Sequence, residues 1–477
     1  MFSDLNSREI SGELIQAYLD YIVPERKNFG LHIVIDSMDG ATTEVAPELF
    51  QKCGCQVDKI SCGINGNFPR HPLGPDPGNE EYIKDLINAV IKNGADLGFA
   101  YDGDGDRLAV VDSDGKVIQP DIYTIVLLKA FNVKKGDKVV MDVRCSQALV
   151  DYVRKNGGQE IYAACGPTSV IGLMRRENGL LGCETTGHIY FNEPEIIFDD
   201  PLFATYKLVE YLSQTNQNLS DILKSVPEYY SVPEKRLNLK DGKQKEEDIF
   251  REYDIRGFVD SQVNEDLMKK IGQAFGSYIK QHVSSKSPKI IVSYDPRPSS
   301  RNLQQTIIEG LMEEGCSVVN GGMLPTSIYS FAIKHKKADA GLHITASHNP
   351  SNYNGVKIRT SDNQFGGEKL QLLKRMIYPE TSEKKNEQNP IIDIAKQKLH
   401  QDHDVVDLVE VDGAKAFFKS GWGLLRASNT QPQLTMRFEA ESEKALKEIA
   451  EKFKKILIGL PGIDDDEVDK GFDDILT

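Results

Sequence analysis

The chain has 477 residues, of which 39% are hydrophobic and 27% are charged, and its formal net charge is −15. This length exceeds what one hydrophobic core serves, so several domains are expected in a protein of ordinary globular composition. The negative charge argues against non-specific binding to nucleic acid or to membranes, and an anionic substrate would need locally gathered Arg and Lys side chains.

Targeting features and cysteines indicate a soluble protein. The chain starts with polar residues rather than with the basic and apolar stretch of a secretion signal. No apolar run approaches the ~18 residues of a membrane span. The seven cysteines are an odd number in a long chain, which argues against a disulfide framework. We expect a cytoplasmic protein without nucleic-acid or membrane partners, present as a monomer or a small homo-oligomer.

An amphipathic helix is predicted for about 11–23, and from Leu31 onwards strands alternate with helices, as in parallel α/β layers. One set of elements occurs three times: a strand ending in Asp, a helix running through Gly into a strand, and a short apolar strand followed by a polar loop. The strand-ending aspartates are Asp36, Asp142 and Asp295, and the polar loops are 102–107, 184–188 and 345–350. We therefore predict three similar domains, each presenting one loop at the carboxyl end of an equivalent strand, where open α/β sheets bind ligands.

The last part of the chain has a different pattern. Short strands are predicted at 408–411, 422–426 and 433–438, followed by an amphipathic helix at 442–456. The acidic stretch 464–474 is expected to be a solvated tail.

The predicted fold class is therefore α/β, with three similar mixed-sheet domains and a smaller α+β C-terminal domain around a central cleft. The predicted boundaries are 1–27 for the N-terminal helix and linker, 28–118, 119–230 and 248–385 for the three α/β domains, 231–247 for a linker that could supply the first strand of the C-terminal domain, and 386–477 for that domain.

The loop 102–107 has the composition of a metal site. Asp102, Asp104 and Asp106 alternate with glycines, which let a tight loop turn three carboxylates inward. Three hard oxygen donors suit Mg²⁺. A calcium EF-hand is excluded because Arg107 stands at the sixth position and Ser113 at the twelfth. A solvated Asp-Gly turn is the alternative. Beside a metal, Arg107 would contact a second anion.

Ser347 follows the apolar stretch 340–344 and precedes His348, Asn349 and Pro350, where the proline keeps the chain extended. An ordinary turn has a similar composition. The Gly-x-Ser-x-Gly pattern of many serine hydrolases is absent, and pairing this serine with a magnesium loop favours phosphoryl transfer. Lys357 is expected to be a proton carrier or phosphate contact, or else a solvated strand residue.

Two further loops carry weaker signals. Glu184, Thr185, Thr186 and His188 offer a carboxylate, two hydroxyls and an imidazole, which suit the hydroxyls of a sugar but also a structural hydrogen-bond network. The range 426–432 combines an Arg with small hydrogen-bonding side chains. Alone it would indicate a capped loop, and beside the other three loops it suits a phosphate clamp.

Together these loops resemble the α-D-phosphohexomutase family, most closely its bacterial phosphomannomutase/phosphoglucomutase branch. The resemblance extends over nearly the whole chain and rests on the segments 251–257 (REYDIRG), 345–350 (TASHNP), 102–107 (DGDGDR), 182–188 (GCETTGH) and 426–430 (RASNT), with minor matches at 142–145 and 65–70. In the family, the domain that carries the serine comes first. Here the order is the metal domain with the Asp loop 102–107, the sugar domain with the loop 184–188, the serine domain with Ser347, and the phosphate-clamp domain with the range 426–432. Pro167 also stands where the nearest relatives have a His.

The resemblance implies a role for each loop. Ser347 would carry a phosphoryl group and hold Mg²⁺ together with the three aspartates of 102–107. The implied catalytic residues are Ser347, His348, Lys357 and Arg256. The implied substrate-binding residues are Tyr253, Arg107, Arg144, Glu184, Thr186, His188, Arg426, Ser428, Asn429 and Thr430.

The implied activity is that of an isomerase. The enzyme would interconvert the 1- and 6-phosphates of mannose or glucose through a phosphoserine and a bisphosphorylated sugar, with glucose or mannose 1,6-bisphosphate as activator. The alternatives are a phosphoglucosamine mutase, a sugar-phosphate phosphatase and a non-catalytic sugar-phosphate-binding homologue.

Overall fold

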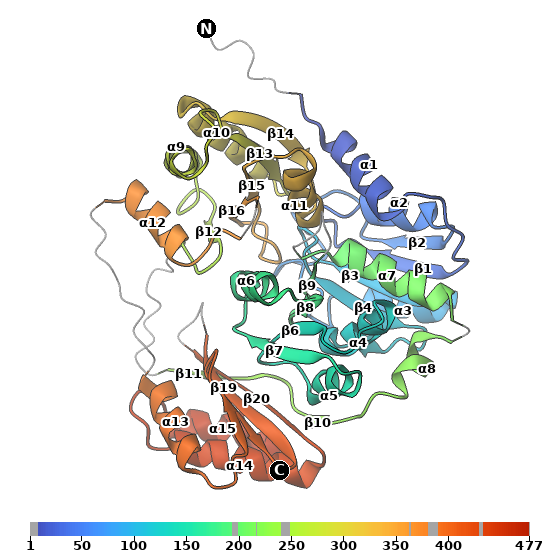
Figure 1. The fold of residues 1–477 in the computed structure, drawn as a ribbon, viewed down its shortest axis with the longest axis vertical. Coiled ribbons are helices and arrows are strands. Elements are labelled where there is room, and N and C mark those ends of the chain that lie inside the picture. The colour runs from blue at the N-terminus through green and yellow to red at the C-terminus, as the bar shows by residue number, and fades with distance from the viewer. Residues whose placement is uncertain are drawn as a thin grey trace.

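The computed structural model describes residues 8–192, 199–215, 217–239, 249–361, 364–379, 390–428 and 433–476. These residues form four β-sheets with helices packed on them (Figure 1), so the α/β fold class is confirmed. Within the described ranges, every helix is too short or too polar to cross a membrane.

Three of the sheets share one strand order. The first sheet has the order β2-β1-β3-β4-β5, the second β7-β6-β8-β9, and the third β14-β13-β15-β16-β12. In each sheet the first three strands named are parallel and the fourth is antiparallel. The strands are β1 (His32–Asp36), β2 (Gln56–Ile60), β3 (Leu97–Tyr101), β4 (Leu108–Asp112), β5 (Val117–Ile118), β6 (Lys138–Asp142), β7 (Gln159–Ala163), β8 (Leu181–Cys183), β9 (Ile189–Phe191), β12 (Ile255–Phe258), β13 (Lys289–Tyr294), β14 (Ser317–Met323), β15 (Ala340–Ile344) and β16 (Tyr353–Thr360).

The shared order places the three polar loops at equivalent positions. They follow β3, β8 and β15, which are fully buried. The neighbouring strands β1, β6 and β13 lead into the three aspartates of the repeat. Each carboxylate accepts a hydrogen bond from the backbone N–H two residues later, at 2.9 Å in Asp36, 2.7 Å in Asp142 and 3.2 Å in Asp295. The repeat seen in the sequence is therefore also a repeat of local structure.

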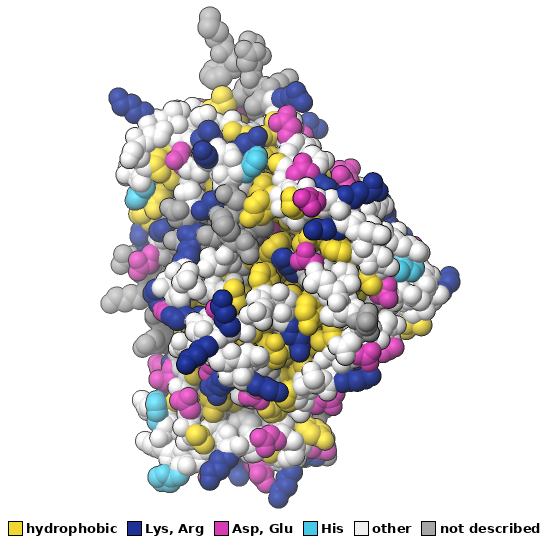
Figure 2. Space-filling model, turned by 45° about the vertical axis from the view of Figure 1, so that its right-hand side comes forward, with side chains coloured by type: hydrophobic (Ala, Val, Ile, Leu, Met, Phe, Trp, Pro, Cys, Tyr) yellow, Lys and Arg dark blue, Asp and Glu magenta, His cyan; other side chains and the backbone are white. Residues whose placement is uncertain are grey.

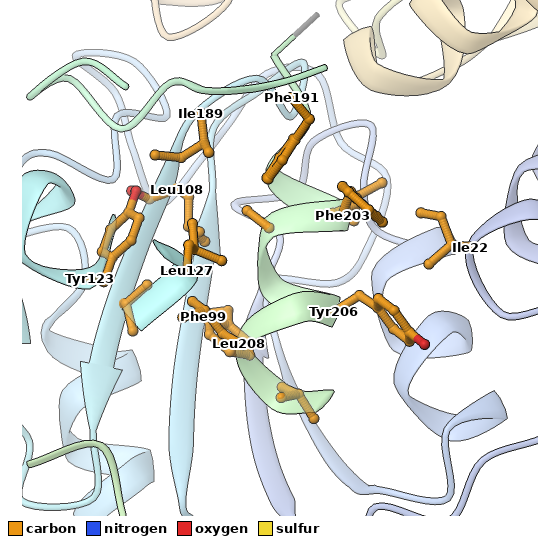
Figure 3. Close-up of a cluster of buried hydrophobic side chains, with 14 of the residues drawn as sticks. Ile22, Phe99, Leu108, Tyr123, Leu127, Ile189, Phe191, Phe203, Tyr206 and Leu208 are labelled. Atoms are coloured by element: carbon orange, nitrogen blue, oxygen red, sulfur yellow. The ribbon is translucent and has the colours of Figure 1, made fainter. Parts of the chain in front are cut away.

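Several helices around these sheets contribute to one large core. This core joins residues of α1, α2, α4 and α7 with residues of α11, the helix that connects β14 and β15 of the third sheet. Figure 3 shows part of it, with Leu208 of α7 beside Phe99 of β3, and Phe203 of α7 near Phe191 of β9. The helices are α1 (Ser11–Ile22), α2 (Val45–Lys52), α3 (Lys84–Asn93), α4 (Pro120–Ala130), α5 (Gln147–Lys155), α6 (Pro167–Glu177), α7 (Pro201–Ser213), α8 (Leu219–Leu223), α9 (Glu265–His282), α10 (Ser300–Glu313), α11 (Thr326–His335) and α12 (Glu368–Ile377).

The fourth sheet lies at the foot of the molecule in Figure 1 and has a core of its own. Its order is β10-β20-β19-β18-β17, and β11 also pairs antiparallel with β20. Its elements are β10 (Tyr230–Ser231), β11 (Lys235–Asn238), α13 (Pro390–Gln401), β17 (Asp407–Val409), β18 (Ala414–Phe418), β19 (Gly421–Ala427), β20 (Gln433–Ala440), α14 (Glu443–Leu457) and α15 (Asp465–Leu476). The third sheet is thus inserted between strands of the fourth. The strand β18 was not predicted from the sequence.

The acidic C-terminal stretch is not the solvated tail that we predicted. It forms the helix α15, and Val468, Phe472 and Ile475 are buried in the core of the fourth sheet. The ring centroids of Phe472 and Phe438 are 5.7 Å apart. The buried residues recur at helical spacing, so α15 has an apolar face that its many acidic residues concealed.

Figure 2 shows acidic and basic side chains interspersed over one face of the molecule. The part of this face that the structure describes carries no continuous basic patch.

Candidate active site

Two of the predicted loops meet directly. The hydroxyl of Ser347, after β15, donates a hydrogen bond to Asp102 Oδ2 at 2.7 Å, and its oxygen lies 3.3 Å from Asp106 Oδ1. Asp102 and Asp106 follow β3 in a different sheet, and 245 residues separate Asp102 from Ser347. All three side chains are buried. The shuffled order of the domains therefore does not keep these loops apart.

The three carboxylates of the Asp loop form a compact buried cluster. Oxygens of Asp102, Asp104 and Asp106 lie within 4.8 Å of one another. The backbone N–H groups of Asp106 and Arg107 donate to Asp102 Oδ1 at 2.9 and 3.1 Å, which closes the loop. Burial, and then the charges of Asp106 and Asp104, raise the pKa of Asp102.

This donor set fits a hard divalent cation. Asp104 Oδ1 is buried and accepts no hydrogen bond from the described residues. A carboxylate oxygen left without a proton donor is available as a metal ligand, and together with Asp102 and Asp106 it offers the all-oxygen set that Mg²⁺ prefers.

Lys357, on β16, supplies a cation to the same cluster. Its ammonium group donates to Asp104 Oδ2 at 2.6 Å and to Asp106 Oδ2. Burial alone would lower the pKa of Lys357, but Asp104 and Asp106 outweigh burial and raise it. Lys357 is therefore a buried, charged residue of the cluster and not a solvated strand residue.

The backbone of the Ser347 loop is held in an uncommon conformation. Ser347 has a φ of 50°, in the left-handed region that non-glycine residues rarely adopt. Its N–H donates to Thr345 Oγ1 at 2.9 Å. Arg297 donates from Nη2 to the carbonyl oxygens of Ser347 and Asn349, both at 2.7 Å. These contacts fix the loop so that the hydroxyl faces the carboxylates.

Arg297 is a residue that sequence reasoning missed. It is 2% exposed, and it also donates from Nη1 to the carbonyl oxygens of Pro350 and Tyr353. A signal was available, because Asp295-Pro-Arg297 repeats the pattern of Asp142-Val-Arg144. In both pairs the arginine Nε donates to the aspartate, at 2.9 Å in the first and 3.3 Å in the second.

A loop of the first domain lies directly on the Ser347 loop. A Cβ atom at Gly74, which has a φ of 112°, would lie 1.9 Å from the carbonyl oxygen of His348, so only glycine fits there. His348 Nδ1 is 3.3 Å from Ser347 Oγ. Burial, and then the charge of Arg107, lower the pKa of His348, which keeps the imidazole neutral. Arg256 donates to Asn349 Oδ1 at 2.7 Å and so also holds this loop.

The third predicted loop reaches the same cluster through His188. Its Nδ1 lies 3.3 Å from Asp199 Oδ2 and 3.9 Å from Asp106 Oδ1. Asp199 in turn pairs with the buried guanidinium of Arg359 on β16. Sequence reasoning missed both Asp199 and Arg359, and neither belongs to a recognisable motif.

Glu184 and its neighbours lie at the start of the same loop. Glu184 Oε2 accepts from the N–H of Gly166 at 2.9 Å, and Arg144 Nη2 is 3.8 Å away. The hydroxyl of Thr186 is buried and has no hydrogen-bond partner among the described residues. Pro167 is the first residue of α6, next to Gly166, and brings no side-chain donor to this region.

The fourth predicted loop is described in part. Arg426 Nε donates to Asp412 Oδ2 at 2.9 Å, and the N–H of Ser428 donates to the carbonyl of Gln433 at 2.8 Å. Asn429 and Thr430 lie outside the described residues.

Arg107 Nη1 is 3.5 Å from Asp76, and the carbonyl of Tyr253 accepts from Gln364 Nε2 at 3.2 Å. Three loops thus meet at Asp106, whereas Arg426 is connected to the Glu184 region through Asp412.

Four family models match this chain. They are described as phosphoglucomutase/phosphomannomutase alpha/beta/alpha domain I, domain II and domain III and the C-terminal domain of the same enzymes, and they match residues 247–384, 15–115, 119–230 and 381–456, respectively.

Individual relatives carry related names. A phosphomannomutase/phosphoglucomutase of Pseudomonas syringae pv. tomato is 37% identical over 225 residues, which are 46% of this chain and 47% of that protein. A phosphoglucomutase of Neisseria gonorrhoeae is 36% identical over 241 residues, or 50% of this chain and 51% of that protein. The chain thus spans about half the length of the curated relatives it matches.

A solved structure shares the fold. It is a phosphoglucomutase/phosphomannomutase family protein from Burkholderia thailandensis, with a TM-score of 0.57 and 22% identity over 93% of this chain and 64% of that chain. With all four domains matched, this chain belongs to the phosphoglucomutase/phosphomannomutase family, and it carries them in the order II, III, I and C-terminal.

Proposed function

We propose that this protein is a phosphohexomutase that interconverts the 1- and 6-phosphates of mannose or glucose through a phosphorylated Ser347. The observation that carries the proposal is the 2.7 Å hydrogen bond from Ser347 to Asp102, inside a cluster of three buried carboxylates. A serine held at a φ of 50° with its hydroxyl against such a cluster suits a phosphoryl carrier better than a structural role.

The residues around Ser347 divide the chemistry among them. Asp102, Asp104 and Asp106 would hold Mg²⁺, which would neutralise charge on the oxygens of the transferred phosphoryl group. Lys357 adds a fixed positive charge beside them. In the transfer, the bond between phosphorus and Ser347 Oγ breaks while a bond to a sugar hydroxyl oxygen forms, and the hydroxyl proton passes to a base. The reverse transfer, from the other phosphate of the bisphosphorylated sugar, restores phosphorylated Ser347.

The remaining predicted residues suit sugar-phosphate recognition. Glu184 and the unpartnered hydroxyl of Thr186 offer hydrogen-bonding groups for sugar hydroxyls. Arg426 suits the phosphate that is not transferred, because a guanidinium binds phosphate with two parallel hydrogen bonds. Mannose and glucose are preferred over glucosamine because 427–430 reads Ala-Ser-Asn-Thr. The enzyme would act in the cytoplasm, with glucose or mannose 1,6-bisphosphate rephosphorylating Ser347.

One assay tests the proposal. The purified protein is incubated with Mg²⁺, a trace of glucose 1,6-bisphosphate, and glucose 1-phosphate or mannose 1-phosphate. Formation of the 6-phosphate supports a mutase, release of free phosphate indicates a phosphatase, and the absence of both products contradicts an enzymatic role. In the Ser347→Ala variant, both the activity and the protein-bound phosphate detected by intact mass should be lost.

A further inference from the structure

Asp412 lies in the turn between β17 and β18 and contacts two groups from different parts of the chain. Its Oδ2 accepts a hydrogen bond from Arg426 Nε at 2.9 Å and another from the backbone N–H of Cys165 at 3.0 Å. Arg426 belongs to the fourth sheet, whereas Cys165 lies between β7 and α6 of the second domain. A single carboxylate oxygen therefore joins the phosphate-clamp arginine to the sugar-binding domain.

The turn that carries Asp412 is pressed against the strand of Arg426. Gly413 has a φ of 82°, and a Cβ atom there would lie 2.2 Å from the carbonyl oxygen of Leu425 and 2.7 Å from Arg426 Cα. Only glycine fits this position. The Asp412 carboxylate is therefore placed by the backbone of the turn.

The hydrogen bonds continue from Cys165 to the sugar loop. The next residue, Gly166, donates its N–H to Glu184 Oε2 at 2.9 Å. Two successive N–H groups thus bind two carboxylates, one beside the phosphate-clamp arginine and one on the sugar side. A shift of Asp412 would change both ends of this connection.

Two further hydrogen bonds join the fourth sheet to the second domain. Lys415 Nζ donates to the carbonyl of Cys145 at 3.1 Å, and Glu439 Oε1 accepts from the N–H of Gln147 at 2.6 Å. Lys415 Nζ also lies 3.8 Å from the ring centroid of Trp422. These contacts orient the edge of the sheet from which Asp412 projects.

We propose that Asp412 is a positioning residue, which holds Arg426 ready for the substrate phosphate and couples that phosphate to Glu184. This inference rests on the proposed function. Among the described residues, the hydrogen bond of the Arg426 guanidinium runs from Nε to Asp412. This bond orients the guanidinium before the substrate arrives, so that Nη1 and Nη2 can meet a phosphate. Because Asp412 makes no contact with the reacting atoms, its effect is on binding and not on phosphoryl transfer.

The first test compares Asp412→Asn and Asp412→Ala with wild type and with Glu410→Gln, a neighbouring change whose exposed carboxylate pairs with His400 at 3.4 Å. Dissociation constants for glucose 6-phosphate are measured by calorimetry, and kcat and KM by the mutase assay. Asp412→Ala should raise the dissociation constant and KM about 10- to 100-fold, because it removes hydrogen bonds to a charged group. The kcat value at saturating substrate should change less than about threefold.

The two substitutions separate positioning from folding. Asp412→Asn keeps the shape and one acceptor oxygen, so it should fold normally and give a smaller increase in KM. Glu410→Gln should match wild type. A purely structural role would lower the active fraction, and with it kcat, and leave KM unchanged.

A double-variant cycle tests the coupling to the sugar side. If the connection through Cys165 and Gly166 is real, the changes in dissociation constant caused by Asp412→Asn and Glu184→Gln should deviate from multiplicative behaviour by at least about threefold. Wild-type binding and turnover with unchanged KM in Asp412→Ala would overturn the inference and leave the proposed function standing. A wild-type protein that binds no hexose phosphate would overturn both.

Discussion

Replacing Arg297 by Met should release the loop that carries Ser347. The Arg297 side chain is fully buried, and its guanidinium donates to the carbonyls of Ser347 and Asn349 at 2.7 Å and of Tyr353 at 3.1 Å, as well as to Pro350. Met has a similar length but no donors, so these carbonyls lose their partner, at about 1–3 kcal/mol for each one that stays buried.

The partner carboxylate adds to this cost. Arg297 Nε donates to Asp295 Oδ2 at 2.9 Å, and both side chains are fully buried. Removing one member of a buried ion pair typically costs about 3–5 kcal/mol, because the other charge is left uncompensated. Since the loop can relax and water can reach some carbonyls, we expect a total loss of at least about 4 kcal/mol in the free energy of unfolding.

Three measurements check this reasoning. Urea unfolding gives the loss of stability, hydrogen exchange gives the opening of 345–350, and intact mass gives the phosphate on Ser347 after incubation with glucose 1,6-bisphosphate. Arg297→Met should speed exchange in this loop and reduce phosphorylation, and Arg301→Met, whose side chain is 66% exposed, is the control. Exchange and phosphorylation at wild-type levels in Arg297→Met would refute the role of Arg297.

Three further changes test other parts of the structure. Adding Mg²⁺ should raise the Tm of wild type but not of Asp104→Asn, because the variant lacks one anionic ligand, and an equal rise in both would contradict the metal site. Burial raises the pKa of Asp200 from 3.8 to about 7, so the folded state keeps a proton that the unfolded state releases, and stability falls as the pH rises between these values. In urea unfolding, the advantage of Asp200→Asn over wild type should therefore grow by about 2 kcal/mol between about pH 5.5 and about pH 7 and then level off, whereas a constant difference would contradict the shift. Phe472→Ala should cost about 3–5 kcal/mol in the free energy of unfolding, because this side chain is buried in the core of the fourth sheet, and a negligible loss would mean that α15 is not packed there.

Features encoded in short stretches could be predicted from the sequence. The repeated pattern of a strand ending in Asp, followed by a polar loop two strands later, predicted the equivalence of β1, β6 and β13. It also predicted that three loops project from the same edges of their sheets. The Asp loop could be interpreted because six consecutive residues, 102–107, contain its carboxylates and its glycines. Such patterns survive in the fold because local backbone geometry decides them.

Contacts between distant residues could not be predicted in this way. Asp199 and Arg359 are 160 residues apart, and Cys165 and Asp412 are 247 apart. Aspartate and arginine are mostly surface residues, so the sequence does not tell which of them a neighbouring domain will bury. Arg297 is different, because its spacing from Asp295 repeats that of Arg144 from Asp142.

Interfaces between domains bring the Ser347 loop and the Asp loop together. The serine domain contacts the Asp-loop domain through α11 and α1, where the rings of Tyr18 and Phe331 pack edge to face at 5.4 Å. Lys357, on the next strand after Ser347, binds Asp104 at 2.6 Å. These contacts join parts of the chain that lie far apart in sequence, and the residues of α1 and α11 at this interface belong to one continuous hydrophobic core.

The insertion point explains why the rest of the fold tolerates this domain order. The strand β11 precedes the inserted domain and pairs with β20, which follows it, so the chain leaves the fourth sheet and returns to the same sheet. An inserted domain is tolerated when its two ends lie close together. The insertion therefore leaves the fourth sheet continuous, and the 2.7 Å contact between Ser347 and Asp102 is made across an interface between two domains.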